Sequence, residues 1–337
     1  MVGLDMTTIK DIAVKADVSI ATVSRILSGN KTYTFSQATI DRVRNAAAEL
    51  NYGPPRKKKQ KQEPAAASGL TIAAVFWFEE AQEEDYLYYR EIRRGMERRF
   101  AGEAISFSSY YSLKHLPENA DGIIAVGKFS AAEVERLSAI TSHLVFVDSS
   151  PDPLAYSSVT ADFFDAMKSI IRYLIGTGHK KIGYIGKKEY VGDGSEEYPD
   201  LKEESYKLIA IAEGIYHPDY LYVIEDPTPS AGFKIASHSM TENMPDAFIV
   251  FSDTVAIGVL SAFQEAGVKI PGDVSIISFD DLPIAQYTFP SLSTVKIHTE
   301  HMGASAVDLL MGELSEKTDF PRKVVIPYEI MIRNSSR

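Results

Sequence analysis

The sequence of 337 residues contains no cysteine. This absence excludes disulfide frameworks, thiolate metal sites and cysteine nucleophiles, and it agrees with a reducing cytosol. Apolar runs are short as well: the longest, 72–78, is far below the roughly 20 residues of a membrane-spanning helix. The chain does not open with a charged segment followed by an apolar one, so we expect no secretory leader and a cytoplasmic location.

Signatures of catalysis and of cofactor binding are also missing. The sequence has no Gly-x-Ser-x-Gly elbow of the kind that serine hydrolases carry. The glycines at 176, 178 and 183 follow a predicted helix and precede a strand, which is the reverse of a dinucleotide-binding loop. His298 and His301 are close in sequence, but no further ligand lies at metal spacing. We therefore expect no enzyme, no metal and no cofactor.

Charge is distributed unevenly along the chain, whose net charge is −11. Residues 1–62 hold 11 Lys and Arg against 5 Asp and Glu, whereas the remainder holds 24 against 41. A basic segment can lie on the phosphates of a nucleic acid, while an acidic body is repelled by them. Charge alone leaves open whether the basic end binds DNA or is merely solvated.

The basic segment has the pattern of three short helices. Thr8 to Asp11 matches a capping box, and apolar residues then recur at helical spacing up to Ala16. Ser19 is placed to cap a second helix, and Ser36 is placed to cap a third. A helix, a tight turn, a second helix and a supporting helix form a helix-turn-helix layout. Periodicity of this kind predicts the layout without assigning a function.

The residue types in this segment are more specific. Residues 8–29 read TIKDIAVKADVSIATVSRILSG, and residues 46–54 read AAAELNYGP. Both stretches resemble the DNA-binding head of the lactose/galactose repressor (LacI/GalR) family. The resemblance implies that the second helix enters the major groove, where its first residues meet base edges and an arginine one turn later contacts guanine. Short hydroxyl side chains on the same helix suit phosphate oxygens. The predicted DNA-contacting residues are Thr8, Ser19, Ile20, Ala21, Thr22, Ser24, Arg25, Lys31, Arg56 and Lys58.

A basic, proline-containing linker is expected at 54–69. Pro54 and Pro55 block a helix where members of the family usually carry a hinge helix, whose leucines insert into the minor groove. This chain also lacks the usual hinge pattern Asn-x-x-Ala-Arg-x-Leu. Arg56 and Lys58 can still contact phosphates or enter a narrow minor groove, and a basic tether that contacts no DNA is the alternative.

From residue 70 onward, apolar strand patterns alternate with amphipathic helix patterns. This order predicts parallel sheets with both faces covered by helices, whose ligand sites lie at the carboxyl ends of the strands. Asp148, Asp253 and Asp280 stand at such ends, and their carboxylates can accept hydrogen bonds from sugar hydroxyls. The same residues are also compatible with a paired-acid glycosidase, or with simple helix caps.

The body resembles the effector domain of the same family, in stretches such as 121–127, 147–153, 159–186 and 251–281. The resemblance implies two α/β lobes around a cleft, like those of periplasmic sugar-binding proteins. We therefore expect an all-α helix-turn-helix head at 1–53, the linker, and an effector-binding and dimerisation domain at 70–337. Its first lobe is expected at about 70–158 plus 289–320, and its second at about 159–288 plus 321–337.

The resemblance also places candidate effector contacts on this chain. Lys202 falls where many relatives have an arginine, and Ser252 and Ile297 replace a common Asn and a common Gln. Lysine keeps the charge but loses the forked geometry of arginine, so the identity of the ligand does not carry over from any relative. The predicted effector-binding residues are Phe78, Asp148, Lys202, Ser252, Asp253, Phe279, Asp280 and His298.

Taken together, these patterns predict a repressor that binds double-stranded operator DNA as a homodimer and responds to a small sugar, in the control of carbohydrate-utilisation genes. A catabolite-control-type regulator, whose corepressor is a phosphorylated carrier protein, is the alternative within regulation. A sugar-active enzyme with an accessory basic domain is the alternative from another class, and the missing catalytic motif disfavours it. Because the sequence shows no leucine-heptad tail, we do not expect a tetramer of the lactose-repressor type.

Overall fold

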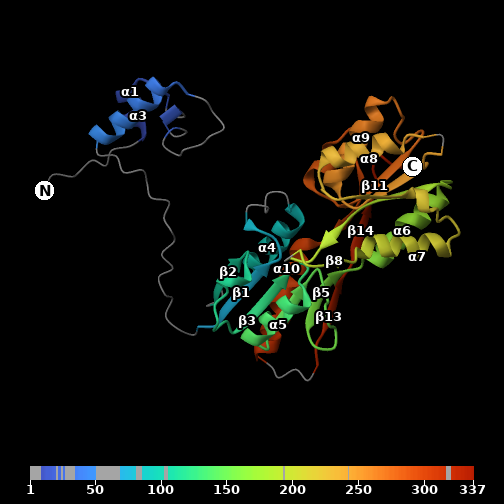
Figure 1. The fold of residues 1–337 in the computed structure, drawn as a ribbon, viewed down its shortest axis with the longest axis horizontal. Coiled ribbons are helices and arrows are strands. Elements are labelled where there is room, and N and C mark those ends of the chain that lie inside the picture. The colour runs from blue at the N-terminus through green and yellow to red at the C-terminus, as the bar shows by residue number, and fades with distance from the viewer. Residues whose placement is uncertain are drawn as a thin grey trace. The chain divides into compact units, whose positions relative to one another are not determined.

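The structure is a computed structural model that describes residues 9–19, 22–23, 26, 35–50, 69–80, 86–101, 105–192, 194–241, 243–315 and 320–337. Two compact units make up the chain, Met1–Ala67 and Ser68–Arg337. No helix within the described ranges is both long enough and apolar enough to cross a membrane. The described residues of the first unit form helices, and the second unit holds sheets and helices (Figure 1).

In the first unit, α1 (Ile9–Ala16) and α3 (Gln37–Glu49) pack through a small apolar core. Ile12, Val23 and Val43 are completely buried in it, as the helical spacing predicts. An ion pair of 2.7 Å between Lys15 and Glu49 joins the two helices at their exposed side. The first unit therefore has the core that a helix-turn-helix layout requires.

Serine hydroxyls act as helix caps in this unit, as predicted. The Oγ atom of Ser19 accepts a hydrogen bond of 3.1 Å from the backbone N–H of Thr22. The Oγ atom of Ser36 likewise accepts one of 3.3 Å from the backbone N–H of Thr39. Hydroxyl acceptors of this kind help to satisfy the backbone N–H groups in the first turn of a helix.

The second unit consists of two lobes, each built on a six-stranded sheet. The sheet of lobe one is parallel throughout. Its strand order is β13 (Lys323–Ile326), β5 (Ser157–Ala161), β4 (Leu144–Val147), β3 (Gly122–Val126), β1 (Thr71–Phe76) and β2 (Ser106–Tyr110). Lobe two has the order β14 (Tyr328–Met331), β12 (Ser293–Ile297), β11 (Ser275–Asp280), β10 (Ala247–Val250), β6 (Ile182–Lys187) and β9 (Leu221–Ile224). Only β14 runs antiparallel to its neighbour there.

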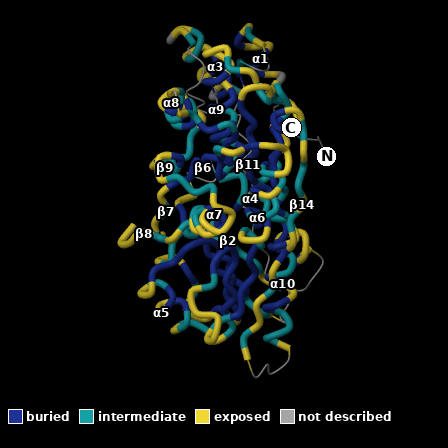
Figure 2. The backbone as a smooth tube through the Cα atoms, turned by 90° about the vertical axis from the view of Figure 1, so that its right-hand side faces the viewer, coloured by how far each residue is buried: buried dark blue, intermediate teal, exposed yellow. Residues whose placement is uncertain are grey.

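Helices cover both faces of each sheet. In lobe one, α4 (Leu87–Phe100) and α10 (Thr299–Ser315) pack on the face that carries Ile72 and Phe76, and α5 (Ala131–Ile140) packs on the face that carries Val75. In lobe two, α6 (Phe163–Gly176) and α7 (Leu201–Ala212) lie on one side, and α8 (Pro229–Ser239) and α9 (Asp253–Glu265) on the other (Figure 1). Central strands such as β6 are accordingly buried along their whole length, while the short strand β8 (Glu197–Tyr198) has an exposed and a half-buried residue (Figure 2).

The helices α4 and α10 cross closely because glycines face each other at the crossing. A Cβ atom at Gly95 would lie 2.0 Å from the backbone O of Glu300. A Cβ atom at Gly303 would lie 2.0 Å from the backbone O of Ile92. No side chain fits at either position, so glycine allows the two backbones to touch and closes this face of lobe one.

The lobe boundaries differ from the prediction. Residues 293–297 are predicted for lobe one but form β12 in the sheet of lobe two, and residues 323–326 are predicted for lobe two but form β13 beside β5. Strand β5 itself stays in lobe one as far as Ala161. Short apolar strands carry no local signal of the sheet that they join, because pairing is decided by contacts distant in sequence.

Candidate functional site

A cavity of about 370 Å³ lies where the carboxyl ends of strands from both lobes face each other. Lobe one contributes Tyr86 to Tyr89 at the start of α4, together with residues after β3 and β4. Lobe two contributes the end of β6, the start of α7 and the residues that follow β10 and β11. Parallel sheets place their ligand sites at this edge, as the sequence predicts.

On the wall of lobe one, Asp148 is held by donors from its own lobe. The hydroxyl of Tyr88 donates to its Oδ1 atom at 2.9 Å, and the hydroxyl of Tyr89 donates to its Oδ2 atom at 2.8 Å. The ammonium of Lys128 forms a close ion pair with the same carboxylate. Asp148 also has a φ angle of 65°, in the left-handed region that most side chains avoid. Asp148 is therefore firmly fixed on the cavity wall.

A buried lysine neutralises the negative charge on this wall of the cavity. Burial alone would lower the pKa of Lys128, but the carboxylates of Asp148 and Glu189 raise it well above its ordinary value. The Nζ atom of Lys128 also donates to the hydroxyl oxygen of Tyr89 at 2.7 Å. Lys128 thus stays charged, and it balances the negative charge that Asp148 brings into the cavity.

On the wall of lobe two, the ammonium of Lys202 is surrounded by aromatic rings. Its Nζ atom lies 5.1 Å from the ring centroid of Phe163, 5.5 Å from that of Phe251 and 5.3 Å from that of Phe279. It donates a hydrogen bond of 2.9 Å to the backbone O of Phe251. Cation–π attraction and this hydrogen bond hold the charge in place without an ion pair.

Asp280 ends β11 and turns toward the same cavity. None of the described residues donates a hydrogen bond to its carboxylate, and its φ angle is 107°. Burial raises the pKa of Asp280, and the charge of Lys202 opposes this rise while that of Asp148 adds to it. A strained residue with an unpaired carboxylate in a cavity has the features of a ligand contact.

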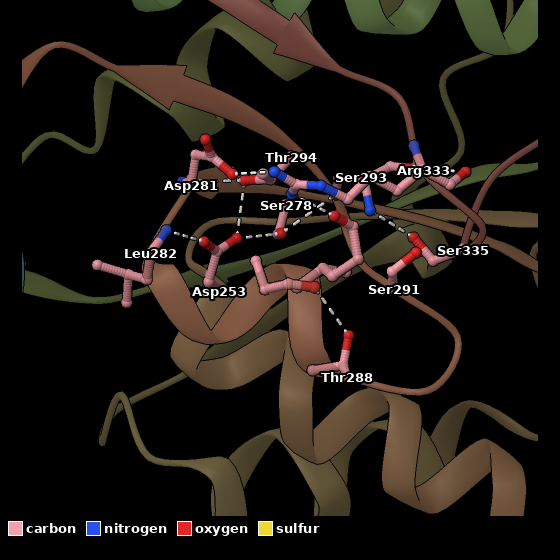
Figure 3. Close-up of polar contacts among 12 residues, drawn as sticks. Asp253, Ser278, Asp281, Leu282, Thr288, Ser291, Ser293, Thr294, Arg333 and Ser335 are labelled. Atoms are coloured by element: carbon pink, nitrogen blue, oxygen red, sulfur yellow. Dashed lines mark hydrogen bonds and ion pairs between the residues drawn. The ribbon is translucent and has the colours of Figure 1, made fainter.

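The predicted residue Asp253 does not reach the cavity. It is completely buried, and its carboxylate accepts hydrogen bonds from Ser278, from Thr294 at 2.7 Å and from the backbone N–H of Leu282 at 2.6 Å (Figure 3). Burial and the charge of Asp280 raise the pKa of this carboxyl, and its hydrogen bonds oppose the rise. Asp253 therefore supports the turn after β11 from behind instead of facing a ligand.

Three further predicted effector-binding residues also do not line the cavity. Phe78 is buried and stacks on Tyr86 with ring centroids 4.8 Å apart. Phe279 is completely buried beneath Lys202. His298 is not among the residues that line the cavity, and its Nε2 atom lies 3.1 Å from a carboxylate oxygen of Glu329. In each case the residue lies next to the cleft in sequence, but its side chain packs elsewhere.

The predicted residues Asp148, Lys202, Ser252 and Asp280 do line the cavity. Ser252 also caps α9, because its Oγ atom accepts from the N–H of Val255 at 3.4 Å. Lining residues that the sequence prediction omits include Tyr86, Tyr88, Tyr89, Lys128, Lys187, Glu189, Tyr198, Asp200 and Asp226. Within the described part of the chain, no His, Asp or Glu side chains gather in a group that could hold a metal ion.

The DNA-contacting prediction is only partly covered by the structure. Ser19 and Thr22 are described, and their hydroxyl groups lie 2.8 Å apart at the start of the second predicted helix. The other predicted contacts lie outside the described residues: Thr8, Ile20, Ala21, Ser24, Arg25, Lys31, Arg56 and Lys58.

Comparison with known proteins matches both units. Residues 8–55 match the bacterial regulatory proteins of the lacI family, and residues 171–336 match a periplasmic binding protein-like domain. The HTH-type transcriptional regulator GalR of Lacticaseibacillus casei is 35% identical, over 98% of this chain and 100% of its own. The HTH-type transcriptional repressor MelR of Bacillus subtilis (strain 168) is 32% identical, over 98% and 97%.

A solved structure agrees with the fold. The Lac repressor bound to ONPG superimposes with a TM-score of 0.68 at 21% identity, over 98% of this chain and 99% of its own. The family match of the head and the two full-length relatives cover both units of the chain. The chain therefore belongs to the lacI family of bacterial transcriptional regulators.

Proposed function

We propose that this chain is a DNA-binding transcriptional repressor whose operator affinity is controlled by a small sugar held between its two lobes. The observation that carries the proposal is the carboxylate of Asp280, which accepts no hydrogen bond from any described residue and faces a cavity shared by both lobes. A carboxylate without a protein partner accepts hydrogen bonds from the hydroxyl groups of a sugar. The caged ammonium of Lys202 beside it can donate to ring or hydroxyl oxygens.

The rest of the wall suits a polar but uncharged molecule. Asp148 is already paired with Lys128, so it adds no net charge to the space around a ligand. Rings such as those of Tyr86 and Phe163 line the cavity and can cover the apolar face of a sugar ring. A volume of about 370 Å³ lies within the range of small-molecule sites and suits a ligand of one or two sugar rings.

The head acts in this proposal as one half of a symmetric DNA reader. Ile20, Ala21 and Arg25 would meet base edges in the major groove, and Ser19 and Thr22 would contact phosphates. Two heads related by a two-fold axis read a near-palindromic operator. Large apolar side chains exposed on lobe two, among them Tyr287 at 76% and Phe289 at 89%, support association of two copies of the chain.

A sugar controls the repressor if it binds one arrangement of the lobes more tightly than the other. A coupling of about 1–3 kcal/mol changes operator affinity by roughly 5- to 150-fold. Both lobes contribute residues to the cavity. The contacts that a ligand makes there therefore differ between the two arrangements of the lobes. The direction of the change, release or tighter binding, depends on which arrangement the ligand favours.

Calorimetric titration of the full chain with galactose, glucose and lactose tests the ligand half of the proposal. One of these sugars is expected to bind the wild-type chain, and its affinity is expected to fall at least about tenfold in Asp280→Asn. If no sugar binds but a phosphorylated carrier protein changes operator affinity, the chain is a catabolite-control-type regulator instead. Hydrolysis of chromogenic glycosides by the purified chain would point to the enzyme alternative.

Operator binding tests the DNA half. The chain is expected to select a near-palindromic duplex from a random pool, with an affinity that falls steeply as salt rises. For Arg25→Ala we expect a loss of about 1–3 kcal/mol in specific binding while the fold stays intact. Unchanged discrimination between selected and random duplexes in Arg25→Ala would contradict the assignment of the head.

A further inference from the structure

A chain of alternating charges crosses the cleft from one lobe to the other. It begins at Asp148 in lobe one, continues to Lys128 in the same lobe, and reaches Glu189 and Lys187 in lobe two. The distance from Lys128 Nζ to Glu189 Oε2 is 3.6 Å, as is that from Lys187 Nζ to Glu189 Oε1. The side chains of Lys128 and Asp148 are only 10% and 4% exposed. Screening by water and salt is therefore weak along this chain of charges.

The backbones of the two lobes also touch at this point. The residues after β6 form a short hairpin of β7 (Glu189–Tyr190) and β8. Within it, the N–H of Gly192 donates to the backbone O of Lys128 at 2.9 Å. A Cβ atom at Gly192 would lie 2.9 Å from the backbone O of Trp77, so only glycine allows this close approach. The hairpin of lobe two is thus seated directly on lobe one.

Trp77 lies under this contact and is the one tryptophan of the chain. The ammonium of Lys187, from lobe two, lies 5.8 Å from its ring centroid, and that of Lys128 lies 5.6 Å from it. The Nε1 atom of Trp77 is buried, and none of the described residues accepts a hydrogen bond from it. If lobe two withdraws, water gains access to this N–H and to the ring.

We propose that Lys128 and Glu189 form an interlobe latch, which holds the lobes together around the cleft whether or not a ligand is present. Lys128 stands between two carboxylates, one from each lobe, and its charge attracts both. Glu189 stands in turn between Lys128 and Lys187. The two are positioning residues: they set the relative placement of the cavity walls rather than the chemistry of ligand contact.

The latch predicts different outcomes for its two members. Glu189→Gln removes the attraction between the lobes, together with the pair between Glu189 and Lys187, but leaves Lys128 paired with Asp148. Lys128→Met leaves two nearly buried carboxylates facing each other across the cleft, which adds repulsion to the lost attraction. Glu189→Gln should therefore partly rescue Lys128→Met, because it removes the carboxylate that repels Asp148 across the cleft. Independent local roles would instead make the two losses add.

The test uses the full chain without any ligand, so its outcome does not depend on the proposed sugar. The emission maximum of Trp77 and its quenching by acrylamide are measured in the wild type, both single variants and the double variant. Glu189→Gln is expected to show a red shift and stronger quenching, and Lys128→Met is expected to show a larger change in both. The double variant should have values between those of the wild type and of Lys128→Met. Small-angle scattering should show a matching increase in the radius of gyration.

Glu213→Gln is the matched control, because it breaks an ion pair of 2.9 Å with Arg172 inside lobe two. Its Trp77 signals should equal those of the wild type. If Lys128→Met does not fold by circular dichroism, the comparison of Glu189→Gln with this control decides the outcome. The latch is refuted if Glu189→Gln, correctly folded, shows the same emission, quenching and radius as the control.

Discussion

The guanidinium of Arg333 donates a hydrogen bond of 2.6 Å to the carboxylate of Asp281, directly beside the cavity residue Asp280 (Figure 3). A second bond of 2.8 Å runs from Arg333 Nη1 to the backbone O of Leu292. Asp280 and Asp281 both have positive φ angles, of 107° and 54°, which cost about 1–3 kcal/mol each in residues other than glycine. The segment after β14 thus holds a strained turn in the orientation that faces the ligand.

Arg333→Ala is expected to lower the free energy of unfolding by about 1.5–3 kcal/mol, because a hydrogen-bonded and largely buried charge pair is lost. It should also weaken sugar binding, since the turn that carries Asp280 loses its support. Chemical denaturation and calorimetric titration measure the two effects. Arg172→Ala, which breaks an exposed pair with Glu213, is the control and should change both by little. Sugar affinity in Arg333→Ala equal to that of the control would show that the ion pair does not position the turn.

Asp280→Asn is expected to separate binding from stability. The variant loses the carboxylate that would accept sugar hydroxyls, so affinity for a bound sugar should fall at least about tenfold, the equivalent of one charged hydrogen bond. The melting temperature without sugar should stay equal or rise, because a buried charge near Asp253 disappears. A clear fall in melting temperature with full sugar affinity would place Asp280 among the structural residues instead.

The buried carboxyl of Asp253 is expected to make stability depend on pH. Its pKa is raised in the folded chain above the ordinary value of 3.8, by burial and by the charge of Asp280. The folded state therefore holds this proton more tightly than the unfolded state, and its contribution to stability is complete at acidic pH. That contribution falls as pH rises from about 4 towards neutrality. Denaturation curves across this window should show a smaller decline in Asp253→Asn than in the wild type, and equal slopes would contradict the assignment.

Adding a side chain at Gly303 is expected to disturb the close packing of α4 and α10 in lobe one. In Gly303→Ala the added Cβ atom would lie 2.0 Å from the backbone O of Ile92, so α4 and α10 must move apart. Such overpacking costs about 1–3 kcal/mol, to be measured as a loss of free energy of unfolding. Gly176→Ala is the control, because no atom lies within 4 Å of its Cβ position at the end of α6. A loss in Gly303→Ala no larger than in this control would disprove the account of the crossing.

The sequence identifies the fold and, at the strand ends, three residues of the cavity wall for a clear physical reason. Asp148, Ser252 and Asp280 follow apolar strands directly, and parallel strands bring their carboxyl ends to one edge. The same rule applies to Lys128 after β3 and Lys187 at the end of β6, which the prediction omits although the signal is present.

Other features leave no such signal in the sequence. Tyr89 belongs to the apolar stripe of α4, and helical spacing cannot show that its hydroxyl reaches Asp148. Asp253 follows Ser252 directly, but the side chains of successive helical residues are about 100° apart around the helix axis. Ser252 therefore lines the cavity while Asp253 is buried. The strands β12 and β13 are each predicted in the wrong lobe, because their partners are fixed by contacts far away in sequence.

Fluorescence anisotropy measures whether a sugar in the cleft controls the affinity of the head for DNA. The full chain is titrated onto a labelled duplex that it has selected from a random pool, with and without the sugar identified by calorimetry. We expect the sugar to change operator affinity by roughly 5- to 150-fold in the wild type and, at the same sugar concentration, to leave it unchanged in Asp280→Asn. An affinity that the sugar leaves unaltered in the wild type, or alters equally in both proteins, would contradict this expectation.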